Sequence, residues 1–293
     1  LNTYINVYRQ LCQNNGNIIH TTFNQTLTST GRLSSSEPNL QNIPTRDDEG
    51  KVLRKIFVSK FENGKIISAD YNQIELRLLA DMSGEENLID AYNRGDDIHA
   101  LTASHIFYKP INEITENERR DAKAVNFGII YGISDYGLSQ NIKSTRATAK
   151  EFIDSYFTKY PKIKKFMDNN IKSAYEKGGA YTKFGRVRRI PELESSKYLT
   201  RTFGERVAMN MPLQGTASDI IKLAMLKVDN RIQQEKLKSQ LILQIHDELI
   251  IDTYPGEEEK VENILKEEME HTANLKVPLL ISIGTGKNLY DCK

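Results

Sequence analysis

The chain has 293 residues, with 40 basic and 39 acidic side chains, a net charge of +1 and 39% hydrophobic residues. These values are typical of a soluble globular protein of one large or two coupled domains, and they do not favour a generic nucleic-acid binder. No apolar run reaches the length of a membrane span, no signal peptide opens the chain, and the two cysteines at opposite ends indicate a reducing compartment rather than a disulfide framework. The chain begins without Met, so we expect it to be a piece of a longer protein.

The first half of the chain predicts a loop, a strand and then helices. Residues 31–50, GRLSSSEPNLQNIPTRDDEG, predict a polar loop because Ser, Asn, Pro and Gly favour turns. Residues 65–71, KIISADY, predict a buried strand that ends in a carboxylate, and QIELRLLADMS after it has helical spacing. From about residue 85 to 178 the pattern is mostly helical. The expected interruptions are Gly95, Pro110, Gly132 to Gly137, and Pro161.

The second half predicts a long helical segment followed by a hairpin. TFGERVAMNMPLQGTASDIIKLAMLKVDNRIQQE predicts one long helix or two abutting helices, in which Pro212 requires a kink or a break. The strand-like segments SQLILQIH and ELIIDTY, a Glu-rich helix and a final strand VPLLISI follow. The predicted fold class is therefore α+β, a small antiparallel sheet backed by helices, with a helical subdomain inserted in the sequence between its halves.

His246, Asp247 and Glu248 interrupt the strand-like segment LQIHDELIID. Because side chains alternate along a strand, the two carboxylates point to opposite faces or lie in a turn. One interpretation is a polar hairpin turn, and the other is a metal-binding carboxylate at a hairpin tip. A metal site needs a partner, and Asp70 at the end of its strand is the candidate. Two such aspartates would suit Mg²⁺ if a triphosphate supplied further oxygens.

NERRDAKAVNFGIIYG, residues 117–132, carries Arg119, Lys123, Phe127 and Tyr131 at intervals of four. On a helix these side chains fall within an arc of roughly 120°, so one face carries two cations and then two rings. This order matches a ligand with phosphates at one end and an aromatic base at the other. The alternative is an amphipathic helix with its rings in the core and its cations in solvent.

The motifs DYNQIELR, RRDAKAVNFGIIYG and IHDELI, in that order, resemble the three polymerase motifs of the family A DNA polymerases, in the bacterial DNA polymerase I group. TGRLSSSEPNLQNIPTR and MNMPLQGTASDIIKLAM are similar to further motifs of the family. The resemblance runs from about residue 20 to the C-terminal Lys293. Leu289 stands where many relatives have Trp, which concerns only local packing.

The resemblance assigns the metal-binding and proton-transfer roles. Asp70 and Asp247 correspond to the metal-holding aspartates, with the Tyr71 carbonyl as a further ligand and Glu248 close to the metals. Two Mg²⁺ ions are implied, with Mn²⁺ able to substitute: one activates the primer 3′-hydroxyl, and the other holds the triphosphate and stabilises the leaving pyrophosphate. Lys123 corresponds to the proton donor to pyrophosphate.

The resemblance also implies a set of dNTP contacts. In this sequence they are Tyr71, Gln73, Glu75, His99, Arg119, Lys123, Phe127 and Tyr131. Arg119, Lys123 and His99 would contact the phosphates. Phe127 would pack against the sugar and base, and Tyr131 would occupy the template-base position in the open state.

Glu75 resembles the steric gate that excludes a ribose 2′-hydroxyl. A carboxylate held against C2′ leaves no room for that oxygen. The alternative is a surface ion-pair partner of Arg77 or Arg94, which would contribute under about 1 kcal/mol.

A further set of residues resembles the contacts to duplex DNA near the primer terminus. They are Arg32, Asn39, Asn42, Arg206, Asn210, Gln214 and His246. Minor-groove acceptors are nearly the same for every base pair, so donors placed there test the shape of the pair without reading sequence.

By this resemblance, residues 1–95 are the N-terminal half of the palm with the end of the thumb, residues 96–200 are the helical fingers, and residues 201–293 are the C-terminal half of the palm. Most of the thumb and the nuclease domains of the family would then lie outside this sequence, which predicts weak DNA binding and low processivity. The implied protein is a DNA-directed DNA polymerase of replication and repair. It would be a monomer in the bacterial cytoplasm at the nucleoid, with primer-template DNA and dNTPs as partners and no membrane.

Three alternatives remain from the residues. A two-metal nuclease also uses paired aspartates but does not need Lys123 and Phe127 on one helix. A single-subunit RNA polymerase shares the metal chemistry, but a glutamate gate at Glu75 argues against ribonucleotides. The third alternative is a non-catalytic DNA-binding fragment that lacks the thumb and exonuclease domains.

Overall fold

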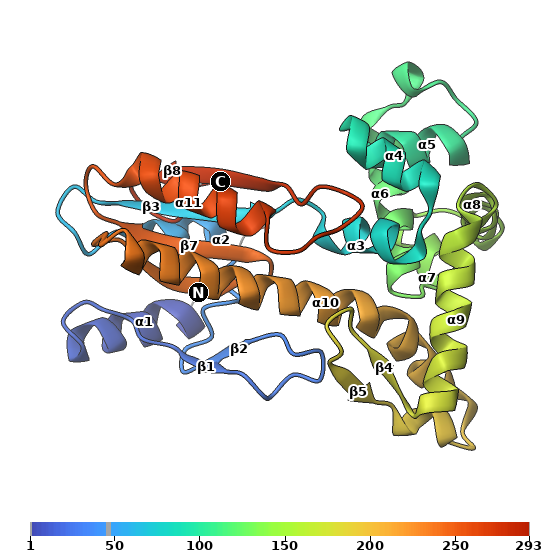
Figure 1. The fold of residues 1–293 in the computed structure, drawn as a ribbon, viewed down its shortest axis with the longest axis horizontal. Helices are drawn as coiled ribbons and strands as arrows, with labels where there is room; N and C mark the ends of the chain where they lie inside the picture. Colours follow the sequence, from blue (N-terminus) through green and yellow to red (C-terminus); the bar gives the residue numbers. More distant parts are fainter. Residues whose placement is uncertain (1, 45–47, 293) are drawn as a thin grey trace. The chain divides into compact units, whose positions relative to one another are not determined.

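The structure is a computed structural model that describes residues 2–44 and 48–292 (Figure 1). The chain divides into two compact units, each made of segments far apart in the sequence. The first unit contains residues 1–72, 218–273 and 280–293, and the second contains residues 73–217 and 274–279. None of the helices in the described ranges is long and apolar enough to cross a membrane.

The first unit is built on an antiparallel sheet, which among the described residues has four strands in the order β6-β7-β3-β8. Its strands are β3 (Lys65–Tyr71), β6 (Gln240–Ile245), β7 (Glu248–Thr253) and β8 (Ile281–Gly286). Its other elements are α1 (Asn2–Asn14), β1 (Thr22–Asn24), β2 (Ser34–Ser36), α2 (Asp48–Val52), η1 (Leu53–Ile56) and α11 (Glu258–Glu270). The helix α10 (Tyr198–Gln234) enters this unit at Ser218. The predicted α+β class with a small antiparallel sheet is therefore confirmed.

The sheet is buried on both faces. Ile66 and Ile250 pack with Tyr8 of α1 and with Leu40 and Ile43 of the segment after β2. The alternation of the strand turns the neighbouring residues of β3 to the other face, where α11 packs against β3 and β8. Burial on both sides explains why β3 reads as a continuous apolar run that gives way to a carboxylate only at Asp70.

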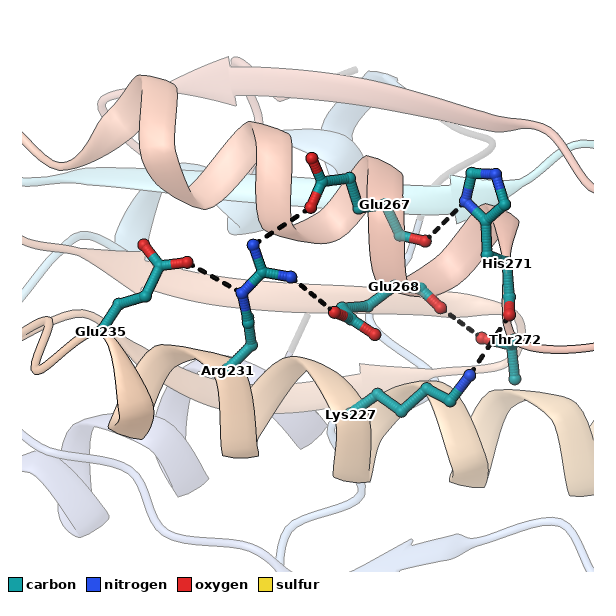
Figure 2. Close-up of polar contacts among 7 residues, drawn as sticks. All are labelled: Lys227, Arg231, Glu235, Glu267, Glu268, His271 and Thr272. Carbon is teal, nitrogen blue, oxygen red and sulfur yellow. Dashed lines mark hydrogen bonds and ion pairs between the residues drawn. The ribbon is translucent and has the colours of Figure 1, made fainter.

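Ion pairs and hydrogen bonds join α10 to α11 and to the residues that follow it (Figure 2). The Arg231 guanidinium of α10 contacts Glu235 on its own helix, at 2.9 Å, and reaches Glu267 at 3.1 Å and Glu268 at 2.8 Å on α11. Lys227, one turn earlier, donates to the carbonyl of His271 at 3.2 Å. Cations of α10 therefore hold the predicted Glu-rich helix, α11, and the residue that follows it.

The second unit is mostly helical. Its elements are α3 (Ile74–Ser83), α4 (Glu86–Arg94), α5 (Ile98–Ile106), η2 (Ile111–Glu113), α6 (Glu116–Ile130), α7 (Asp135–Asn141), α8 (Arg146–Lys159), α9 (Pro161–Lys177), β4 (Gly179–Tyr181), β5 (Val187–Arg189), η3 (Pro191–Glu194) and the first part of α10. The expected breaks fall as the sequence indicates, since α4 ends at the left-handed Gly95 and α9 starts with Pro161. Its helices pack against one another, and burial between them stabilises the unit.

Two helices of this unit, α3 and α6, carry or adjoin most residues of the predicted dNTP site, and His99 lies in α5. Between Ile74 and Asp81 every residue of α3 is buried, so the helix is enclosed on all sides rather than on the one face that its spacing predicts. α6 starts at a capping box, in which the Thr115 hydroxyl accepts from the Glu118 amide and the Glu118 carboxylate accepts from the Thr115 amide. This box fixes where α6 begins and therefore which side chains share its exposed face.

Several boundaries differ from the sequence-based expectations. α10 continues through Pro212 without the break that was one of the two expected outcomes. The loop predicted for residues 31–50 contains β2 and the start of α2, and its residues 45–47 lie outside the described part. The last strand begins at Ile281, after the apolar VPLL stretch, and extends to Gly286. These shifts arise because strand ends depend on the pairing partner, which local sequence does not specify.

Candidate active site

The two predicted metal-binding aspartates lie at the same end of the sheet of the first unit. Asp70 is the penultimate residue of β3 and stands opposite Glu248, the first residue of β7. His246 and Asp247 form the turn between β6 and β7, and the Tyr71 amide donates to the Asp247 carbonyl at 3.1 Å. The hairpin-turn interpretation and the carboxylate-tip interpretation are therefore both compatible with the structure, because the turn itself presents Asp247.

Tyr71 is held between the two aspartates by both its backbone and its side chain. Its ring is buried, and its hydroxyl donates to the Met269 carbonyl at the end of α11, at 2.7 Å. The Thr272 hydroxyl lies 3.4 Å away. Burial raises the pKa of the Tyr71 phenol far above its usual range, so it remains a donor. The backbone segment that carries Asp70 is thus fastened to both the hairpin and α11.

Glu248 shares a face with Asp70 but points into a buried polar cluster. Its carboxylate accepts a hydrogen bond from the Ser68 hydroxyl, and Glu248 is only 3% exposed. Burial raises the pKa of the Cys292 thiol to about 11, with a contribution from the negative charge of Glu248. Burial lowers the pKa of the Arg54 guanidinium, while the charge of Glu248 opposes that shift. Glu248 is therefore part of the support beneath Asp70.

The residues assigned to DNA in the first unit gather beside the same hairpin. The Gln41 side chain donates to Gln244 of β6, to the backbone carbonyl at 3.2 Å and to the side-chain oxygen at 3.0 Å. Gln41 lies between the exposed Asn39 and Asn42, and His246 at the turn is also exposed. Asn39 and Asn42 therefore flank a residue that is bonded to β6, and His246 lies in the turn itself. The Arg32 carbonyl accepts from the Thr28 hydroxyl at 2.6 Å, which fixes the backbone of a more distant segment.

The donor set at this end of the sheet fits Mg²⁺. It consists of carboxylate oxygens from Asp70 and Asp247 with the Tyr71 backbone between them, and hard oxygen donors of this kind are what Mg²⁺ prefers. Among the described residues no group of three or more His, Cys, Asp or Glu side chains forms a metal cage.

In the second unit, α6 presents the predicted cation and ring positions along its surface. Arg119 forms an ion pair with Asp97 at 2.7 Å, and this contact lowers the pKa of the Asp97 carboxyl against the opposing effect of burial. Lys123 is exposed one turn further on, and Phe127 is half-buried. Tyr131 is 42% exposed, at the C-cap of α6 rather than inside the helix. The alternative that buries both rings in the core is therefore wrong for Tyr131.

A pocket of about 440 Å³ opens beside this part of α6. Phe127, Tyr131 and Arg206 are among the residues that line it, with Gly128 and Gly132 at its wall. Gly132 has φ of +63°, and a Cβ on Gly128 would come within 2.7 Å of the Ile133 side chain. The backbone conformation at Gly132 and the close approach at Gly128 both favour glycine at these two positions.

Glu75 and Gln73 at the start of α3 are both held by tyrosines. Glu75 is 5% exposed and accepts from the Tyr131 hydroxyl at 2.8 Å. Gln73 has a left-handed backbone, and its side-chain oxygen accepts from the Tyr92 hydroxyl at 3.0 Å. The burial of Glu75 contradicts its interpretation as an exposed ion-pair partner. Arg94, one of the proposed partners, pairs with Asp96 instead, at 2.7 Å.

His99 is buried close to the cations Arg119 and Lys123 of α6. It lies in α5, is 2% exposed, and its Nδ1 is 3.0 Å from the Asn126 side-chain nitrogen of α6. Burial lowers the pKa of His99 to about 4; the Asp97 charge opposes this, and the charges of Arg119 and Lys123 add to it. The ring is therefore neutral at physiological pH.

Three further residues assigned to DNA lie along α10 in the second unit. Arg206, Asn210 and Gln214 recur every four residues, so they share one face of the helix. Asn210 Oδ1 is buried and has no hydrogen-bond partner among the described residues. A buried amide oxygen in this state is uncommon in folded proteins.

Several residues that hold the site were missed by sequence reasoning. They are Ser68, Asp97, Asn126 and Gln41. Two of them carry a local signal, since Asp97 is an N-cap residue before IHALTAS, and Asn126 is a lone amide between apolar neighbours. Ser68 and Gln41 carry no local signal, because their partners, Glu248 and Gln244, are distant in the sequence.

Comparison with known proteins agrees with this geometry. A family model described as DNA polymerase family A matches residues 1–291. DNA polymerase I of Caldicellulosiruptor bescii is 49% identical over 294 aligned positions, which cover 100% of this chain and 34% of that protein. DNA polymerase I of Geobacillus stearothermophilus is 49% identical over 275 positions, which cover 94% of this chain and 31% of that protein. The chain thus spans about a third of the length of these relatives.

The fold has a close counterpart among solved structures. The POL domain of Pol1 from M. smegmatis, in complex with DNA primer-template and dNTP, matches with a TM-score of 0.94 and 40% sequence identity. The match covers 99% of this chain and 51% of that one. On the family match over nearly its whole length, the chain belongs to DNA polymerase family A.

Proposed function

We propose that this chain performs template-directed DNA synthesis, adding dNMP from a dNTP to a primer 3′-hydroxyl with release of pyrophosphate, in replication and repair. The observation that carries the proposal is the pairing of Asp70 with the hairpin tip. The two aspartates are 177 positions apart in the sequence, yet the strand end of one is hydrogen-bonded to the backbone of the other. A hairpin built only to turn the chain does not need this arrangement.

In the proposed reaction, the primer 3′-oxygen bonds to the α-phosphorus, and the bond from that phosphorus to the bridging oxygen of pyrophosphate breaks. Asp70, Asp247 and the Tyr71 carbonyl are the proposed ligands for two Mg²⁺ ions, or for Mn²⁺ in their place. When bound, the ions would supply charge stabilisation for the attacking and leaving oxygens. Glu248 would support Asp70 from the buried side through its bond to Ser68.

The residues of α6 and its neighbours are the proposed dNTP contacts. Arg119 and Lys123 would bind the phosphates, with Lys123 giving its proton to the leaving pyrophosphate. Phe127 would lie beside the sugar and base, Tyr131 at the template-base position, and Glu75 against C2′. The exposure of Lys123 and the burial of Glu75 support these assignments. Gln73 would contact the dNTP from the start of α3.

Primer-template DNA is the proposed macromolecular partner. The contacts would come from Arg32, Asn39, Asn42, Arg206, Asn210, Gln214 and His246. The polymerase domain in the matching solved structure is complexed with DNA primer-template and dNTP, which supports the same partners here. We further propose that residues 1–95 and 201–293 act as palm and residues 96–200 as fingers. The site of action would be the nucleoid in the bacterial cytoplasm.

Primer extension with each of the four dNTPs tests the proposal. We expect addition directed by the template in Mg²⁺, and we expect Asp70→Asn and Asp247→Asn each to reduce the rate by several orders of magnitude without loss of the fold. Asp168→Asn, at an exposed position of α9, is the matched control and should extend as the unmodified chain does. Degradation of the primer would instead indicate a nuclease. DNA binding without addition or degradation would indicate a non-catalytic DNA-binding fragment.

A further inference from the structure

Three buried side chains from α5 and α6 form a hydrogen-bonded row that ends at His99. The Thr102 hydroxyl donates to Asn126 Oδ1 at 3.1 Å, and Asn126 Nδ2 lies 3.0 Å from His99 Nδ1. Thr102 is 0% exposed, Asn126 1% and His99 2%. Thr102 and Asn126 are shielded from water, so their polar groups need buried partners, and the Thr102 hydroxyl also forms a hydrogen bond with the Tyr160 side chain.

The chemistry of the row fixes where the imidazole proton lies. The Thr102 hydroxyl donates to Asn126 Oδ1, and in this orientation the nitrogen of the same amide faces the His99 ring. The amide nitrogen only donates, so His99 Nδ1 must offer a lone pair. A neutral ring with a lone pair on Nδ1 carries its proton on Nε2.

We propose that Thr102 and Asn126 are positioning residues that lock His99 in the Nε2–H tautomer, so that the ring presents a neutral donor to a phosphate of the incoming dNTP. The phosphate contact rests on the function proposed above, whereas the tautomer does not. A phosphate oxygen accepts hydrogen bonds, so the other tautomer would turn a lone pair toward it.

The charged groups around His99 fit this role. Arg119 and Lys123 already provide the positive charge for the triphosphate, and both disfavour a third cation on the ring. Asp97 favours the charged ring, but Asp97 is engaged by Arg119 and caps the start of α5. The ring therefore remains neutral, as a burial-lowered pKa of about 4 requires.

The tautomer can be read directly by NMR. In nucleotide-free protein labelled with ¹⁵N-histidine, long-range ¹H–¹⁵N spectra separate protonated from unprotonated ring nitrogens. The chain has five histidines, and His99→Gln identifies the His99 signals by their loss. At neutral pH we expect the proton on Nε2. A proton on Nδ1 would show that the Asn126 amide is inverted and would overturn the proposal.

Substitutions at Asn126 and Thr102 test whether these two residues set the tautomer of His99. Asn126→Asp replaces the donor with an acceptor of the same shape, so the His99 proton should move to Nδ1. Thr102→Val removes the hydroxyl that orients the amide and should give mixed tautomers, whereas Thr102→Ser should keep the unmodified pattern. Asn93→Asp makes the same chemical change on an exposed helix position away from His99 and should leave the spectrum unchanged. Unchanged spectra in both Asn126→Asp and Thr102→Val would refute the lock.

Single-nucleotide insertion tests the phosphate contact separately. Asn126→Asp should raise the KM for dNTP by about tenfold or more, the loss expected for one hydrogen bond to a charged group, with a smaller change in kcat. Thr102→Ser keeps the hydroxyl and should leave the KM for dNTP unchanged. If His99→Gln leaves dNTP use unchanged while the Nε2–H signal is present, the phosphate role is wrong and the tautomer lock stands. If the spectrum shows Nδ1–H while His99→Gln weakens dNTP use, the lock is wrong and the function stands.

Discussion

Glu75 is a buried carboxylate that accepts a hydrogen bond from Tyr131, a ring at the edge of a pocket. It is 5% exposed, and the Tyr131 hydroxyl donates to it at 2.8 Å. An ionised group in such a position needs donors to offset its desolvation. A carboxylate held in this way has a fixed place, which is what a gate at the sugar requires.

We predict that Glu75→Ala raises ribonucleotide incorporation by orders of magnitude, because truncation opens space at C2′. Deoxynucleotide incorporation should fall less, since the metal-binding and phosphate residues are unchanged. Insertion kinetics with matched rNTP and dNTP measure the ratio of kcat/KM values. Glu86→Ala, at an exposed glutamate of α4, serves as the control. A ratio that stays at its original value in Glu75→Ala would remove Glu75 from the gate.

The Tyr71 side chain holds the end of β3, next to Asp70, without taking part in the proposed reaction. Removing its hydroxyl in Tyr71→Phe removes one donor to the Met269 carbonyl, which still accepts from the Thr272 amide, so we expect a loss of about 0.5–1.5 kcal/mol of unfolding free energy. Urea denaturation measures this loss. Tyr8→Phe is the control in the same unit, because the buried Tyr8 hydroxyl has no hydrogen-bond partner among the described residues. Equal losses in the two variants would mean that the bond to α11 does not stabilise the fold.

At the scale of elements, α11 is attached to α10 mainly through charge. Three carboxylates surround Arg231, and together they raise the pKa of its guanidinium (Figure 2). The side chain is 35% exposed, so salt screens these pairs. The Tyr71 hydroxyl donates to the Met269 carbonyl at the C-terminal end of α11. The ion pairs of Arg231 therefore support the end of β3 indirectly, through α11.

We predict that Arg231→Met lowers the Tm at low ionic strength and that the difference narrows as salt is added. Lys172→Met is the control, since Lys172 reaches only Glu176, at 4.0 Å, and is largely exposed. Thermal unfolding of the three proteins between low and high salt gives the comparison. A Tm difference for Arg231→Met that is independent of salt would point to packing of the side-chain stem instead of charge.

At the scale of the whole molecule, the chain interleaves two units in its sequence. Asp70 and Asp247, the proposed metal ligands, belong to the first unit, and Arg119, Lys123, Phe127 and Tyr131, the proposed dNTP contacts, belong to the second. Net charge is close to zero, so attraction to DNA depends on where cations gather rather than on their excess.

We predict a monomer. Sedimentation equilibrium should give one species near 33.5 kDa across a hundredfold range of protein concentration. A single active site of this kind does not require a second copy of the chain to complete it. A mass that rises with concentration, together with extension activity that rises with it, would show instead that two copies build the site.

The sequence by itself determined the elements that carry the site. Alternation and apolar content predict β3, helical spacing predicts α3 and α6, and His246 to Glu248 marks the hairpin tip. These features are local, because the period of a helix or strand is written in neighbouring residues. The family resemblance then supplied the roles that spacing cannot supply.

Only the tertiary structure decided how distant residues meet. It brought Asp70 to Asp247, buried Glu75 under Tyr131, and joined Asn126 to His99. Such contacts depend on strand pairing and helix packing across many positions, and single-residue propensities do not encode them. The sequence also did not predict that the Glu248 side chain points into the core, where it accepts from Ser68. A hairpin sequence does not specify which of two adjacent carboxylates turns inward.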